Sequence, residues 1–110
     1  MADTKCDVKS LTDIVDRCFD LAMDNRLTEA QSTKYLALGK ELRGSLLNLI
    51  SARFEEGTPQ LEQANAELKS LNAAIKKDSE AIQKVADTVK SLGTLVTALD
   101  KLLGVAASFV

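Results

Sequence analysis

Apolar residues recur with helical spacing along most of the chain. In residues 10–25 they stand at Leu11, Ile14, Val15, Cys18, Phe19 and Ala22. This i, i+3, i+4, i+7 spacing is typical of a helix that buries one face. Ser10 followed by Asp13 has the pattern of a helix N-terminus. We therefore predict a first helix over residues 10–25, after a flexible polar leader over residues 1–9.

A second helix is predicted over residues 28–56. Thr28 and Gln31 have the spacing of a capping box, in which each side chain accepts a hydrogen bond from a backbone N–H. The apolar positions spread over more than one face, so we expect more than one neighbour. They are Tyr35, Leu36, Leu38, Leu42, Leu46, Leu47, Leu49, Ile50 and Phe54. Gly57, Thr58 and Pro59 then have the order of a helix end, an N-cap and a first helical residue, which predicts a tight turn.

From Leu61 to the last residue, apolar side chains follow a heptad repeat. The a positions are Leu61, Leu68, Ile75, Ile82, Val89, Val96, Leu103 and Val110, and the d positions are Ala64, Leu71, Asp78, Val85, Leu92, Leu99 and Ala106. A repeat of this length predicts one helix over residues 59–110, roughly 78 Å long at 1.5 Å per residue. The alternative is a break at Asp78-Ser79, because both residue types cap helices. The break would give a compact four-helix bundle.

The predicted fold class is therefore all-α. We expect a long antiparallel helical hairpin, coiled-coil-like, with the helix over 10–25 added in bundle-type packing. The whole chain, residues 1–110, is expected to form a single helical domain.

The helix over 59–110 widens its apolar face toward the C-terminus. The flanking e and g positions hold few of the Glu and Lys residues that specify a two-stranded zipper, so a bundle or an interface is indicated. The helix over 28–56 is too short to cover the whole helix over 59–110. Apolar surface that stays uncovered usually marks an interface. The predicted partner-binding residues are Leu92, Leu95, Val96, Leu99, Leu102, Leu103 and Phe109. The sequence thus predicts a non-enzymatic protein-protein interaction or self-assembly module, with a protein partner or a homo-oligomer.

Residues 91–110 also raise the alternative of a membrane-active protein. Their length matches the ~20 residues of a spanning helix. However, Asp100 and Lys101 stand near the centre, where each costs roughly 2.5–3.5 kcal/mol. A narrow polar stripe along Lys90, Thr94, Thr97, Lys101 and Ser108 favours a mostly buried helix in water. The alternative function is a pore-forming or holin-like helical protein whose C-terminal segment engages lipid.

Composition excludes much chemistry. The chain has no histidine and no glycine-rich phosphate loop. Glu55 and Glu56 are adjacent, so on a helix their side chains point about 100° apart. We therefore predict no enzyme activity, cofactor or metal. A net charge of −2 and 4% aromatic residues argue against a nucleic-acid partner.

The two cysteines, Cys6 and Cys18, form neither a CxxC motif nor zinc spacing. Two reduced thiols in a cytoplasmic protein are expected, with a disulfide between them or between subunits as the alternative. The polar start has no apolar stretch typical of a secretory signal, which also favours the cytoplasm.

Charged residues form two rows on the predicted helices. Asp13, Asp16, Asp20 and Asp24 follow one face of the first helix. Lys69, Lys76, Lys77 and Lys84 follow the helix over 59–110. Such rows are typical of solvated faces, and the acidic row has a basic partner or a divalent cation as its alternative.

Overall fold

The computed structural model describes residues 4–80 and 85–109, which form four helices and two short strands. The helices are α1 (Val8–Ala22), α2 (Glu29–Leu49), α3 (Pro59–Glu80) and α4 (Val85–Gly104). The strands are β1 (Ala52–Arg53) and β2 (Ser108–Phe109).

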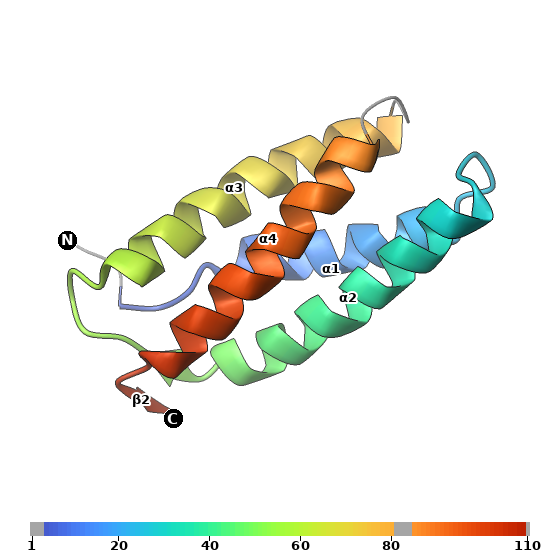
Figure 1. The fold of residues 1–110 in the computed structure, drawn as a ribbon. Coiled ribbons are helices and arrows are strands. Elements are labelled where there is room, and N and C mark those ends of the chain that lie inside the picture. Colours follow the sequence, from blue (N-terminus) through green and yellow to red (C-terminus); the bar gives the residue numbers. More distant parts are fainter. Residues whose placement is uncertain (1–3, 81–84, 110) are drawn as a thin grey trace.

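Two antiparallel hairpins, α1–α2 and α3–α4, pack on one another (Figure 1). α1 lies along α3 and runs in the same direction, and α2 likewise runs with α4. The resulting bundle measures 42 × 22 × 18 Å along its principal axes. The prediction of an all-α fold with bundle-type packing is confirmed.

The single helix predicted over residues 59–110 is wrong. α3 ends at Glu80, and α4 returns along it as the second half of a hairpin. Asp78 and Ser79 belong to α3, so the helix continues past the predicted break, and residues 81–84 lie outside the described part of the chain. Because the chain folds back, the apolar faces of α3 and α4 pack on one another. In one continuous helix of roughly 78 Å the two faces could not meet.

The observed helix ends can be compared with the predicted ones. Asp7, not Ser10, caps the first helix: its carboxylate accepts hydrogen bonds from the Ser10 backbone N–H at 3.1 Å and hydroxyl at 2.8 Å. The capping box of Thr28 and Gln31 is confirmed. Gly57 has a φ of +83°, which glycine adopts at low cost, and α3 begins at Pro59 as predicted. The turn is closed by the Thr58 hydroxyl, which donates to the Glu55 carbonyl at 2.6 Å.

The predicted helix over 28–56 ends early because β1 follows it. β1 pairs antiparallel with β2, with Ala52 opposite Phe109, so residues 108–109 are also not helical. The leader is held in place at the same end of the bundle: the Phe54 N–H donates to the Thr4 carbonyl at 2.8 Å. The described part of the leader, from residue 4 onward, therefore contacts the end of the bundle.

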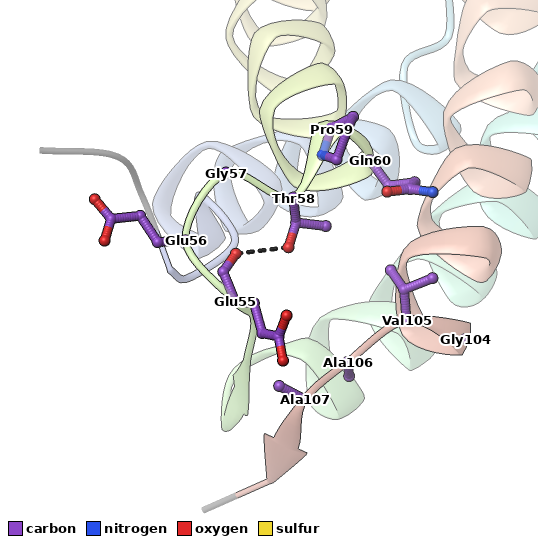
Figure 2. A pocket seen from close by; sticks show the side chains of 10 residues that line it. All are labelled: Glu55, Glu56, Gly57, Thr58, Pro59, Gln60, Gly104, Val105, Ala106 and Ala107. Carbon is purple, nitrogen blue, oxygen red and sulfur yellow. Dashed lines mark hydrogen bonds between the residues drawn. The ribbon is translucent and has the colours of Figure 1, made fainter.

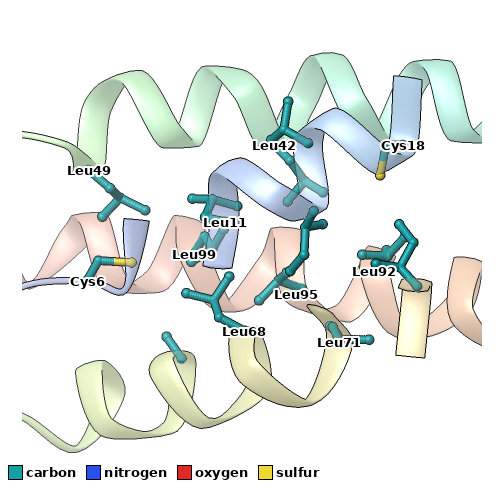
Figure 3. Close-up of a cluster of buried hydrophobic side chains, with 14 of the residues drawn as sticks. Cys6, Leu11, Cys18, Leu42, Leu49, Leu68, Leu71, Leu92, Leu95 and Leu99 are labelled. Atoms are coloured by element: carbon teal, nitrogen blue, oxygen red, sulfur yellow. The ribbon is translucent and has the colours of Figure 1, made fainter. Parts of the chain in front are cut away.

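The core runs along the bundle axis and draws on all four helices (Figure 3). Its largest fully buried side chains include Leu11, Ile14, Leu42, Leu68, Ile75, Leu92 and Leu99. In α4 the fully buried positions are d and g of the predicted heptads, whereas the a positions Val89, Val96 and Leu103 are only partly buried. The buried stripe is thus rotated toward the side where the sequence pattern widens.

Candidate interaction surface

The predicted binding residues of the C-terminal segment whose burial the structure describes pack into the core. Leu92, Leu95, Leu99 and Leu102 are fully buried. Val96 and Leu103 are partly buried against the core, and Phe109 lies in β2. These leucines form the protein's own core, which corrects the expectation of an exposed apolar tail. The reason is the α3–α4 hairpin, because α3 packs against the apolar face of α4 that a continuous helix would have left exposed.

Exposed apolar side chains gather instead on the α1–α2 hairpin. Met23, at the end of α1, is 86% exposed, and Leu36, on α2, is 40% exposed. Leu47 and Ile50 are 63% and 60% exposed and stand three residues apart at the end of α2. Val105, just after α4, is the other large apolar side chain that is exposed in the described part of the chain. We use the name hairpin face for the outer side of α1 and α2 that carries Met23, Leu36, Leu47 and Ile50.

Charged rows flank these apolar residues. On α1, Asp13, Asp16 and Asp20 are exposed, and on α2, Lys40 and Arg43 are exposed. The positions three and four residues from Lys40 and Arg43 in α2 hold no acidic residue. Within residues 4–80 and 85–109, the ion pair that forms is Arg26 with Asp24 at 2.6 Å, in the loop between the two helices. The hydrogen bonds from Arg26 lower the pKa of Asp24 to about 2.

The register of the two helices follows from a close contact at Gly39. A Cβ atom placed there would lie 3.2 Å from Cε1 of Phe19 and 3.3 Å from Cβ of Cys18. Gly39 therefore stands level with Phe19 and Cys18. Because the helices are antiparallel, Asp16 then lies at a level between Lys40 and Arg43. The acidic row and the basic row run side by side at the same height.

A groove lies between α2 and α4. It encloses about 440 Å³. Its lining residues are Lys34, Ala37, Leu38, Glu41, Val89, Lys90 and Gly93. A Cβ at Gly93 would meet open space. The groove is open and shallow, and the lining combines partly buried apolar side chains with exposed lysines.

A larger open pocket, of about 600 Å³, lies at the end of the bundle between residues 55–60 and 104–107 (Figure 2). Glu55 and Glu56 are its acidic residues, and their carboxylates point in different directions.

A smaller hollow of about 230 Å³ between α3 and α4 is lined by Glu67, Ser70, Leu71, Ser91 and Thr94. In the described part of the chain, the Oε2 atom of Glu67 is buried without a hydrogen-bond partner. No group of three or more His, Cys, Asp or Glu side chains that could hold a metal ion occurs among the described residues.

Both cysteines are free and buried. Burial raises the pKa of Cys6 to about 12, and the same cause raises the pKa of Cys18 to about 12. Thiols with such pKa values remain protonated and unreactive at neutral pH. Cys6 and Cys18 lie toward opposite ends of the core (Figure 3).

Membrane insertion was the alternative predicted for the tail. In the residues that the structure describes, none of the helices combines the length and the apolarity needed to cross a bilayer. Comparison with protein-family models, with curated proteins and with solved structures gives no match.

Sequence reasoning missed the hairpin face. The available signal was the spread of apolar residues around α2. We interpreted this spread as contact with more than one neighbouring helix. α2 does contact both α1 and α4, yet Leu36, Leu47 and Ile50 remain exposed. Of the predicted acidic row, Asp13, Asp16 and Asp20 are exposed on α1, whereas Asp24 lies in the loop after the helix and pairs with Arg26. The relation of the row to Lys40 and Arg43 depends on the packing of two helices.

Proposed function

We propose that this protein is a non-enzymatic protein-binding module that docks its partner on the hairpin face. The observation that carries the proposal is the exposure of Leu47 and Ile50, one helical turn apart. They lie beside Lys40 and Arg43, which have no acidic residue three or four positions away on α2. Burying an exposed Leu or Ile side chain contributes roughly 1–2 kcal/mol to association. Flanking charges orient the partner and exclude wrong ones.

The rest of the molecule supports binding rather than catalysis. The pockets described above combine no nucleophile with a general base, and both thiols are buried with a raised pKa. We further propose a cytoplasmic location, since free cysteines are typical of reducing compartments.

A photo-crosslinking side chain at position 47 tests the proposal. In the cell that makes the protein, we expect one adduct of defined mass from position 47 and none from the same label at Lys69, an exposed residue of α3. The partner identified in the adduct, once purified, should bind the unmodified protein and the Lys69→Asp variant. It should not bind the Leu47→Asp, Ile50→Asp variant. Equal labelling from both positions, or none from position 47, would argue against the hairpin face.

A further inference from the structure

The hairpin face carries both signs of charge in two parallel rows. Asp13, Asp16 and Asp20 form the row on α1, and Lys40 and Arg43 form the row on α2. Among the described residues, neither row forms an ion pair. A surface that pairs Asp16 and Asp20 must therefore present cations opposite this part of α1, and a surface that pairs Lys40 and Arg43 must present carboxylates opposite α2.

The same face of a second copy meets this requirement in one orientation. A twofold axis parallel to the helices, lying in the interface, stacks α1 of one copy on α2 of the other at the same height. Asp16 then approaches Lys40 and Arg43 of the second copy, because its level lies between theirs. A twofold axis perpendicular to the helices would instead place acidic row on acidic row, which costs free energy.

We propose that the partner on the hairpin face is a second copy of this chain, related by the twofold axis parallel to the helices. This inference rests on the proposed function and names its partner. The contact is isologous, so it closes as a dimer and leaves no open end. In the same register, Leu36 of one copy lies near the level of Met23 of the other copy, so the contact also covers exposed apolar side chains.

The size of the face suits a stable dimer. A long face of the bundle extends 42 Å by about 20 Å, between its 22 and 18 Å widths. Specific interfaces bury about 800 Å² on each partner, so most of one face is sufficient.

Other occupants leave part of the face unpaired. An acidic helix would pair with Lys40 and Arg43 but would repel the row on α1. An anionic bilayer would meet the same repulsion from Asp13, Asp16 and Asp20.

Reciprocal charge reversal tests the dimer. One variant carries Asp16→Lys and Asp20→Lys, which makes its face basic, and the other carries Lys40→Asp and Arg43→Asp, which makes its face acidic. We expect the dissociation constant of each variant alone to rise at least ~10-fold, because both rows then face like charge. An equimolar mixture should form dimers again, since every row meets its opposite. The matched control, Lys69→Asp with Lys76→Asp on α3, should dimerise like the unmodified protein. Sedimentation equilibrium measures the two variants, their mixture, the control and the unmodified protein.

A zero-length carbodiimide crosslink tests the same contact without any substitution. We expect Asp16–Lys40 or Asp20–Lys40 crosslinks in the dimer, joining a heavy-isotope chain to a light one in mixed samples. Circular dichroism checks that the variants fold.

Several outcomes would contradict the proposal that the partner is a second copy of this chain. One is a monomer at about 0.5 mM, a concentration at which a dimer with a micromolar dissociation constant is nearly complete. Others are dimers that survive both reversals, and a mixture that fails to associate. A monomer whose position 47 crosslinks to a different protein would overturn the dimer and leave the proposed function standing. Flotation of the unmodified monomer with phosphatidylserine vesicles would overturn both.

Discussion

Asn65 joins the leader to α3 through a buried amide. Its Oδ1 atom accepts a hydrogen bond from the Asp7 N–H at 2.7 Å, and its Nδ2 group donates to the Lys5 carbonyl at 3.2 Å. The side chain is only 8% exposed, so water cannot readily replace these bonds. The amide thereby holds Asp7 where its carboxylate caps α1, and the start of the first helix depends on a residue 58 positions away.

Asn65→Ala should destabilise the fold by about 1–3 kcal/mol, because it removes two part-buried hydrogen bonds at once. Asn72→Ala is the matched control, one heptad later on the same helix. Asn72 is more exposed and makes one long hydrogen bond to Asp13 at 3.4 Å, so its loss should cost less than ~0.5 kcal/mol. Urea unfolding measures both. Equal losses for the two variants would contradict the role given to Asn65.

Local signals in the sequence predicted the helix ends that depend on a few neighbouring residues. The capping box at Thr28 and the turn at Gly57-Thr58-Pro59 are complete within four residues, so no distant contact was needed. The reversal after Glu80 entered the sequence prediction only as the alternative break at Asp78-Ser79, because no glycine or proline marks it. A heptad pattern also looks the same in a helix that continues and in one that folds back on itself.

Long-range contacts account for what the sequence could not show. β1 and β2 are too short for an alternating pattern, and they exist because Arg53 and Ser108 meet at one end of the bundle. The hairpin face also depends on long-range contacts. Leu36 and Leu47 look like core residues in the sequence, and only the placement of α1 and α4 around α2 leaves them exposed.

The packing of α1 on α2 can be tested at two glycines of α2. Gly44→Ala should stabilise the protein by up to ~1 kcal/mol, because alanine favours helix and its Cβ would meet open space. Gly39→Ala gains the same helix propensity but places its Cβ 3.3 Å from Cβ of Cys18, which is fixed to the backbone of α1. The helices must then separate, so this variant should be at least ~1 kcal/mol less stable than Gly44→Ala. Thermal unfolding decides, and equal stabilities would mean that the helices tolerate a wider spacing.

The whole bundle determines how stability changes with pH, because folding removes both thiols from water. The pKa of each cysteine is about 12 in the folded protein and 9.0 as its ordinary value. Above pH 9 the unfolded chain loses these protons while the folded chain keeps them. The free energy of unfolding should therefore fall as pH rises from 9 toward 12, by up to about 1.4 kcal/mol per pH unit for each thiol.

Replacing both cysteines by alanine separates this effect from that of the other groups that titrate at alkaline pH. The Cys6→Ala, Cys18→Ala variant loses packing in the core, so its free energy of unfolding should be lower than that of the unmodified protein already at pH 8. Its decrease between pH 9 and pH 11 should nevertheless be smaller, because the thiol protons no longer contribute. Urea unfolding at one-unit pH intervals measures the two slopes. Parallel slopes would show that the thiols ionise alike in both states, which their burial among core side chains from several helices opposes.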